Sequence, residues 1–284
     1  MIIFKHPEDL SNFIVKRKTA NRIIGFVPTM GALHEGHIDL VTRARNDSQL
    51  VVCSIFINPT QFNDPGDYEK YPTTIEKDIG LLEKAGCDIL FLPSLTDMYP
   101  GGITPTRHYE LGFLATILEG KFRPGHFQGV CQVVHRLLDI VIPDKLYLGQ
   151  KDFQQCMVLK KLVEVLGINT KITICPTHRE PDGLAMSSRN MRLNESERKK
   201  APVIYEALFS IKKDIKNGNF EQLKKRAKQL LTDAGFKIDY LEIFETGNFQ
   251  IAGNYDSKKT FIALAAAYLN EVRLIDNIIL NDVE

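Results

Sequence analysis

Continuous apolar runs alternate with amphipathic segments along the first part of the chain. The runs have the character of strands buried on both faces, and they lie at 22–30, 50–58, 87–93, 144–149 and 169–176. Segments with apolar residues at helical spacing separate them, at 37–47, 73–86, 130–143 and 152–167. A strand, helix, strand order predicts parallel strands joined by right-handed crossovers. We therefore expect a Rossmann-like, doubly wound α/β domain over residues 1–176.

The pattern changes after residue 176. Two charged amphipathic helices are expected at 194–218 and 220–235, the first opened by Asn194 as a helix cap. Three strands are expected after them, at 237–244, 260–269 and 272–280. This order predicts a smaller α+β domain over residues 177–284.

Composition and charge narrow the class of protein. The 284 residues include 36 basic and 35 acidic side chains, so no overall charge attracts nucleic acid or an anionic membrane. The lysine runs of the C-terminal helices include acidic residues, which favours solvated faces over a nucleic-acid patch. No apolar stretch is long enough for a signal peptide or a membrane span. The five widely spaced cysteines predict reduced core thiols, and we expect a cytoplasmic protein.

The turn after the first expected strand, in FVPTMGALHEGHIDLV, carries His34 and His37. Zinc is one interpretation, but these histidines are three positions apart, whereas the helical zinc motif spaces them four apart. They can also simply cap and pack the turn. The remaining interpretation is a phosphate grip, in which Gly31 and Gly36 allow close backbone approach while N–H groups and imidazoles donate. The spacing disfavours zinc and leaves the other two open.

Three further junctions place polar residues beyond the carboxyl ends of strands, where α/β sheets bind ligands. Asn58 and Gln61, in FINPTQF, suit either orientation of a small polar substrate or a plain Asn-Pro turn. Lys151 and Asp152, in LGQKDFQQ, suit a phosphate and a ribose hydroxyl or metal ion. The stretch GLAMSSRN, 183–190, suits a mobile phosphate clamp or a hinge with a helix cap. Together the junctions predict a site for nucleotide phosphate and a small polar substrate.

Several stretches carry a family resemblance along almost the whole chain: VPTMGALHEGH, SIFINPTQF, RPGHFQGV, GQKDFQQ and DGLAMSSRN. The chain resembles the pantoate:beta-alanine ligases, also called pantothenate synthetases. The two-histidine turn alone indicates only the wider HIGH-motif nucleotidyltransferase superfamily, which class I aminoacyl-tRNA synthetases share. The resemblance implies ligation of (R)-pantoate and beta-alanine by ATP through a pantoyl adenylate, with release of AMP and pyrophosphate. The product, pantothenate, is a precursor of coenzyme A.

The resemblance also implies roles for residues around the nucleotide. His37 matches a catalytic proton donor, and His34 and Lys151 suit stabilisation of the departing pyrophosphate. The positions that match ATP contacts are Met30, Gly31, Ala32, Leu33, His34, Glu35, Gly36, His37, Gly149, Gln150, Lys151, Asp152, Met186, Ser187, Ser188 and Arg189. Mg²⁺ is expected with ATP, but its protein ligands are unassigned. Asp78 lies in a region that the family links to Mg²⁺, and a solvated helix carboxylate is an equally good interpretation.

The acceptor substrates are assigned in the same way. Gln61, Gln155 and Asn58 match the pantoate pocket, and Gln61 also lies near the beta-alanine site of the family. The resemblance further implies a homodimer and a C-terminal domain that closes over the mixed anhydride as a lid. Two positions depart from the family pattern: His178 near the adenine and Leu148 beside pantoate.

Two other functions are considered. A related nucleotidyltransferase that adenylates a phosphate would need an added cationic pocket, whereas Asn58, Gln61 and Gln155 form a neutral set. A non-catalytic tRNA-binding or regulatory module would show a basic face and decayed motifs, and the sequence shows neither.

Overall fold

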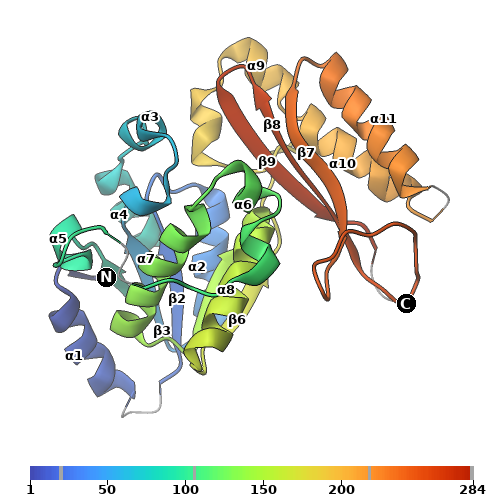
Figure 1. The fold of residues 1–284 in the computed structure, drawn as a ribbon. Coiled ribbons are helices and arrows are strands. Elements are labelled where there is room, and N and C mark those ends of the chain that lie inside the picture. The colour runs from blue at the N-terminus through green and yellow to red at the C-terminus, as the bar shows by residue number, and fades with distance from the viewer. Residues whose placement is uncertain (19–21, 105–106, 217–218, 282–284) are drawn as a thin grey trace. The chain divides into compact units, whose positions relative to one another are not determined.

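The computed structural model describes residues 1–18, 22–104, 107–216 and 219–281, and the chain divides into two compact units, Met1–Pro176 and Thr177–Glu284. The first unit is built on a six-stranded sheet (Figure 1). Its strands are β1 (Ile2–Phe4), β2 (Ile24–Thr29), β3 (Leu50–Ile55), β4 (Ile89–Phe91), β5 (Lys145–Gly149) and β6 (Lys171–Cys175). They pair in parallel in the order β1-β4-β3-β2-β5-β6. The predicted doubly wound parallel sheet is confirmed.

Helices cover both faces of this sheet (Figure 1). One face carries α2 (Glu35–Asp47) and α4 (Ile75–Lys84), and the other carries α1 (Pro7–Lys18), α7 (His126–Val141) and α8 (Phe153–Leu166). Short helices lie in the connections: α3 (Pro65–Glu69), α5 (Leu95–Met98), α6 (Glu119–Phe122), η1 (Pro59–Gln61), η2 (Gly112–Ala115) and η3 (Gln150–Asp152).

The two helical layers explain the continuous apolar runs of the sequence. In β3, Val51, Cys53 and Ile55 enter the core cluster formed with α2 and α4. The alternate residue Val52 points to the opposite face and is also fully buried. A strand covered on both faces needs apolar side chains at every position, which is why no alternation appears.

The chain before the first predicted strand also has regular structure. β1 adds an edge strand beside β4, and α1 follows it on the α7 face. The pattern of hydrophobic residues did not predict either element. β1 is three residues long, and Ile2 and Ile3 are 48% and 42% exposed, so the run is too short and too open to show a periodicity.

The second unit packs its helices on a three-stranded antiparallel sheet, as expected for the α+β segment (Figure 1). Its strands are β7 (Lys237–Glu245), β8 (Phe261–Leu269) and β9 (Val272–Ile279). Its helices are η4 (Ser188–Arg192), α9 (Glu195–Lys200), α10 (Val203–Asp214) and α11 (Phe220–Asp233). Ile204, Leu208 and Leu223 pack against Ala263 and Ala265 in a core of its own.

The helix predicted at 194–218 is wrong in its continuity. Asn194 caps α9 as expected, in a reciprocal capping box with Glu197. The helix then ends at Lys200, and α10 begins at Val203 after a turn at Ala201 and Pro202. Proline has no N–H to donate to the preceding turn, so the helix is interrupted there. Residues 217 and 218 of the predicted helix lie outside the described part of the chain.

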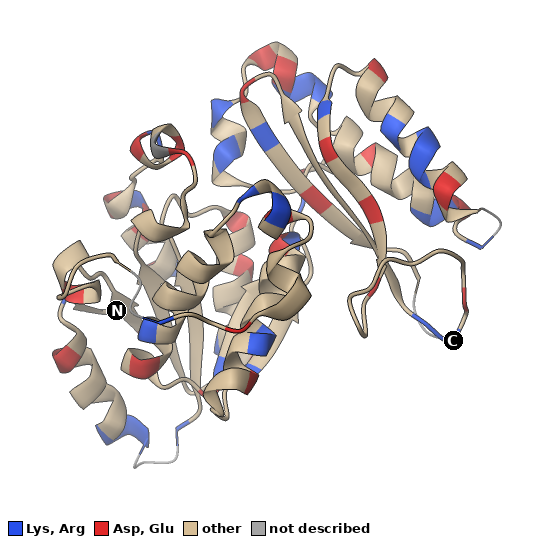
Figure 2. Ribbon diagram, in the orientation of Figure 1, with Lys and Arg blue, Asp and Glu red and all other residues tan. Residues whose placement is uncertain are grey.

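Charged side chains of the second unit are mixed in sign (Figure 2). On α11, Lys224 pairs with Glu221 and with Glu242 of β7, and Arg226 pairs with Asp214 of α10. The exposed pair of Arg226 and Asp214 fits the predicted solvated helix faces, whereas Lys224 is 6% exposed and lies on the buried side of α11. Within the described residues, no helix is both long and apolar enough to cross a membrane.

Candidate active site

The strand order reverses between β2 and β5, which lie side by side at the centre of the sheet. The chain moves from β2 outward to β3 and β4, and later returns to place β5 and β6 on the other side. A crevice opens at such a point because the connections leave the sheet in opposite directions. The turns at Met30–His37 and Gly149–Asp152 follow these two strands, so the structure brings two of the predicted junctions to the switch point.

His34 and His37 form a reciprocal cap at the start of α2. The Nδ1 atom of His34 accepts a hydrogen bond from the Gly36 N–H at 3.2 Å, and Nδ1 of His37 accepts one from the His34 N–H at 3.3 Å. The ring centroids are 4.1 Å apart. Since both Nδ1 atoms accept, the proton of each neutral ring is on Nε2. The capping interpretation is therefore correct.

His37 is half-buried and lies in an electropositive setting. Burial, and then the charge of Lys151, lower the pKa of His37 from 6.5 to about 4. The two residues are far apart in sequence, but they lie in the turns that follow the neighbouring strands β2 and β5. At pH 7 the imidazole is neutral and acts as a hydrogen-bond donor rather than as a cation.

The backbone of the histidine turn is held by a buried carboxylate. Both oxygens of Asp78, on α4, accept hydrogen bonds of 2.9 Å from the N–H groups of Ala32 and Leu33. Asp78 is 0% exposed, so it is not a solvated helix carboxylate. The N–H groups of Ala32, Leu33 and Gly36 are thus bonded within the protein, and Gly36 is one of the helix donors that the phosphate-grip interpretation offers to a ligand.

Asn58 and Gln61 lie where β3 leads into η1, next to the histidine turn. The Asn58 amide is 1% exposed and accepts from the Tyr99 hydroxyl at 2.8 Å. Its Nδ2 donates to Gln61 Oε1 at 3.1 Å, and Gln61 Nε2 lies 3.0 Å from the sulfur of Met30. Asn58 therefore orients the Gln61 amide. The half-buried Gln61, predicted to bind pantoate, in turn contacts Met30 of the predicted ATP-binding turn.

A support beneath Gln61 was not predicted from the sequence. The Gln61 carbonyl accepts from His126 Nδ1 at 2.8 Å and from the Arg123 guanidinium at 3.2 Å. Burial, and then Arg123, lower the pKa of His126 to about 4, so the ring is neutral. A Cβ on Gly129 of α7 would lie 2.1 Å from the Thr60 carbonyl oxygen. Arg123, His126 and Gly129 lie in RPGHFQGV, a stretch whose only signal in the sequence is the family resemblance.

The third junction follows β5. Gly149 ends the strand, and Gln150, Lys151 and Asp152 form the one-turn η3 before α8. Asp152 is exposed at the start of α8, and Gln155 is half-buried in its first turn. The neighbouring Gln154 is 3% exposed and bonds to α6 and to the segment before it, so it is structural. Leu148, a departure from the family pattern, is buried in β5.

The fourth junction belongs to the second unit. Ser187 caps η4 by accepting from the Arg189 N–H at 3.2 Å, and Ser188 is 7% exposed. The N–H of Met186 donates to the carbonyl of His178 at 3.0 Å, so residues 178–186 form a narrow hairpin. The His178 ring is exposed.

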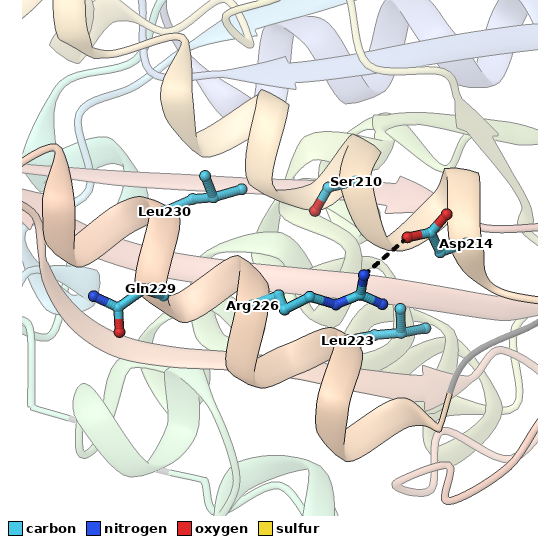
Figure 3. Close-up of a pocket in the computed structure, with 6 residues that line it drawn as sticks. All are labelled: Ser210, Asp214, Leu223, Arg226, Gln229 and Leu230. Carbon is cyan, nitrogen blue, oxygen red and sulfur yellow. Dashed lines mark ion pairs between the residues drawn. The ribbon is translucent and has the colours of Figure 1, made fainter.

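A cavity of about 340 Å³ lies elsewhere in the second unit, between α10 and α11 (Figure 3). The ion pair of Arg226 and Asp214, 3.3 Å long, spans the side chains that line it. Its lining residues are Ser210, Asp214, Leu223, Arg226, Gln229 and Leu230. None of them is a predicted site residue, so this cavity is separate from the candidate site.

Comparison with known proteins places the chain among similar sequences and structures. The profile of the family described as pantoate-beta-alanine ligase matches residues 2–279. A pantothenate synthetase of Porphyromonas gingivalis is 42% identical over 98% of this chain and 99% of its own. A crystal structure of pantothenate synthetase from Thermus thermophilus superposes with a TM-score of 0.92 at 39% identity, covering 99% of this chain and 100% of that one. Another, from Francisella tularensis and complexed with beta-gamma ATP and beta-alanine, gives 0.81 at 41% identity, covering 99% and 98%.

Proposed function

The chain belongs to the pantoate-beta-alanine ligase family, and from this premise we propose which residues carry out each step of its reaction. It is an ATP-using enzyme that joins (R)-pantoate to beta-alanine and makes pantothenate. The pantoate carboxylate attacks the α-phosphorus of ATP, and pyrophosphate leaves. The amine of beta-alanine then attacks the acyl carbon of the pantoyl adenylate, and AMP leaves.

The observation that carries the proposal is the placement of the histidine turn and the Lys151 turn directly after β2 and β5, two neighbouring parallel strands at the switch point of the sheet. Negative charge grows on pyrophosphate as the α-phosphorus bond breaks. The Lys151 ammonium and the Nε2–H donors of His34 and His37 stabilise that charge. Met30 to His37 and Gly149 to Asp152 hold ATP on either side of the crevice, with Ala32 and Leu33 contributing through their carbonyls or side chains.

Pantoate lies beside the triphosphate, against Gln61 and Gln155. Gln61 supplies both an amide donor and an acceptor to a hydroxy acid, and Asn58 fixes the orientation of that amide. The contact between Gln61 and Met30 supports neighbouring sites for the two substrates, as in-line attack requires. The same side of Gln61 faces beta-alanine in the second step.

Mg²⁺ accompanies ATP as a phosphate complex. Across the described residues there is no cluster of three or more His, Cys, Asp or Glu side chains suited to a metal ion. That fits an ion that arrives with the nucleotide and takes most of its ligands from phosphate and water. When bound, it neutralises charge on the phosphates.

Residues 177–284 act as a lid that keeps the mixed anhydride dry until the amine arrives. Met186, Ser187, Ser188 and Arg189 contact ATP from this unit.

The enzyme works as a homodimer, and this part of the proposal rests on the family resemblance alone. It works in the cytoplasm, and its five buried, unpaired cysteines support this location. Burial raises the pKa of the Cys87 thiol to about 11, and neither step calls for a thiolate.

A pyrophosphate-release assay tests the reaction and its order. With ATP, Mg²⁺ and pantoate, we expect one stoichiometric burst of pyrophosphate, because the adenylate stays bound. Addition of beta-alanine should give steady turnover to AMP and pantothenate, identified by mass spectrometry. Folded protein that releases no pyrophosphate with pantoate would overturn the assignment.

Replacing Gln61 with alanine should weaken the use of pantoate more than that of ATP. The change removes an oriented amide but leaves the histidine turn in place, so we expect the KM for pantoate to rise about tenfold, on the scale of one hydrogen bond. Steady-state kinetics with each substrate varied in turn measures the effect. Gln229→Ala, on α11, is the matched control. Equal losses for pantoate and ATP would argue against a substrate role for Gln61.

A further inference from the structure

Asp78 is a buried carboxyl side chain whose hydrogen-bond donors are two backbone N–H groups and one hydroxyl. Its carboxylate is 0% exposed and takes hydrogen bonds from three donors: the Ala32 and Leu33 N–H groups at 2.9 Å, and the Thr74 hydroxyl at 3.0 Å. Burial of a carboxylate is costly unless such donors replace its lost hydration. An apolar side chain at this buried position of α4 would avoid that cost, so the aspartate indicates that its hydrogen bonds matter.

The backbone that Asp78 holds is unusual. Gly31 and Ala32 both lie in the left-handed region, with φ of +83° and +49°. A Cβ on Gly31 would lie 3.2 Å from Asp78 Oδ2 and 3.0 Å from Ile55 Cγ2. A left-handed alanine persists only where its surroundings impose it, and the bonds to its own N–H and to the next one do so here.

This turn fixes the direction of the two histidines. Leu33, whose N–H is held by Asp78, is followed immediately by His34, which caps α2 and bonds to His37. A change in the backbone at Ala32 and Leu33 therefore shifts the Cα positions of His34 and His37 and the direction of their rings. We propose that Asp78 is a positioning residue for adenylation: it locks the left-handed turn that aims His34 and His37 at the leaving pyrophosphate.

The inference rests on the proposed role of the histidine turn. It gives Asp78 a role other than that of a Mg²⁺ ligand. A magnesium ion would need at least one carboxylate oxygen turned toward the crevice. Both oxygens instead face the turn from behind, and the side chain has no exposed surface. A positioning role and a metal-binding role thus make different predictions for the same variants.

Asp78→Asn is the main test. Asparagine has the same shape but turns an NH₂ group toward a backbone N–H, so one anchor of the turn is lost. We expect single-turnover pyrophosphate release to fall about 10²-fold, the scale of a small displacement of catalytic groups. Formation of pantothenate from supplied pantoyl adenylate and beta-alanine should stay near the wild-type rate, since that step has no pyrophosphate to release. The Mg²⁺ concentration for half-maximal rate should not change.

Two further variants make the test independent of folding defects. Thr74→Val removes one of the three donors, so it should lower adenylation in the same direction but less, and it carries the test if Asp78→Asn does not fold. Asp88→Asn is the matched control. Asp88 also accepts a hydrogen bond from a backbone N–H, that of Val51 at 2.8 Å, but at the amino end of β3, away from the histidine turn. It should leave adenylation unchanged.

Three results would overturn the inference. Equal loss of both half-reactions would reduce Asp78 to a structural role, and a raised Mg²⁺ requirement with rescue at high Mg²⁺ would make it a metal ligand. Normal adenylation in folded Asp78→Asn would also overturn it. In that last case His37→Ala, run alongside, separates the two proposals: if it too is normal, the proposed site has failed, and if it is slow, only the role of Asp78 has failed.

Discussion

Replacement of His37 by alanine should lower the rate of pyrophosphate release by roughly 10²-fold or more, the usual cost of one transition-state donor. The Nδ1 atom of His37 is occupied by the His34 N–H, which assigns the ring proton to Nε2. That donor meets charge that exists mainly in the transition state, so kcat should fall much more than ATP affinity. Single-turnover kinetics with ATP and pantoate, together with nucleotide titration, measures both quantities.

A second substitution separates catalysis from capping. In His37→Asn the Oδ1 atom can replace Nδ1 as the acceptor for the His34 N–H, but no group replaces Nε2–H. We expect this variant to be as slow as His37→Ala while keeping the cap at the start of α2. His108→Ala, at an exposed histidine, is the control. A near-normal rate in either folded His37 variant would remove His37 from the mechanism.

The lowered pKa of His37 is consistent with this role. With a pKa of about 4, the ring is neutral at pH 7 and needs no counter-charge while the site is empty. A neutral imidazole can donate a strong hydrogen bond to developing negative charge without binding the ground state tightly. Lys151, which helps to lower the pKa, supplies the permanent positive charge.

The fold could be predicted for those elements whose residue types are determined by burial alone. β3 is buried at every position, so its apolar run identifies a central strand without any knowledge of its neighbours. The glycines after α4, α8 and α11, namely Gly86, Gly167 and Gly235, have left-handed φ angles, and they end these helices as the sequence indicates. By contrast, β1 is short and exposed, and its place depends on pairing with β4, a contact between distant segments that no local pattern records.

The sequence predicts where the candidate site lies, but it does not predict the contacts within it. Strand ends place the histidine turn, Asn58 and Lys151 at one edge of the sheet, because parallel strands share that edge. Whether Asn58 faces a ligand or the protein depends on Tyr99, 41 positions away. Asp78 resembles any carboxylate on a helix surface until its bond to Ala32, 46 positions away, is known. Polar residues with distant partners are what sequence patterns cannot resolve.

One ion pair fastens the hairpin at 178–186 in the second unit, next to the residues that we propose to contact ATP. Arg179 donates to both oxygens of Asp276, at 2.7 and 3.0 Å, and its guanidinium lies 4.4 Å from the centre of the Tyr205 ring. It also donates to the Gly183 carbonyl at 2.9 Å, across the hairpin. Asp276 is 2% exposed in β9, so the pair fastens residues 179–185 to the sheet.

Asp276→Ala should destabilise the second unit by about 3 kcal/mol, because it removes a buried carboxylate and leaves the half-buried Arg179 guanidinium without its counter-charge. Denaturant unfolding of the full chain, followed by circular dichroism, measures the free energy of unfolding. Glu195→Ala is the control, since Glu195 and Lys199 form an exposed pair on α9 worth at most about 1 kcal/mol. A loss for Asp276→Ala no larger than the control's would show that the pair does not hold this unit together.

A double substitution tests whether the cost comes from the unpaired charge or from lost packing. Replacing both members, Arg179→Met with Asp276→Leu, removes the two charges together and keeps much of the volume, so it should cost less than Asp276→Ala alone. Adenylation should be slow both in Asp276→Ala and in the double variant. Each change loosens the hairpin that supports Ser187 to Arg189, and methionine cannot donate to the Gly183 carbonyl. Recovery of stability without recovery of rate would make Arg179 a positioning residue for the phosphate clamp. Recovery of both would confine the pair to stability.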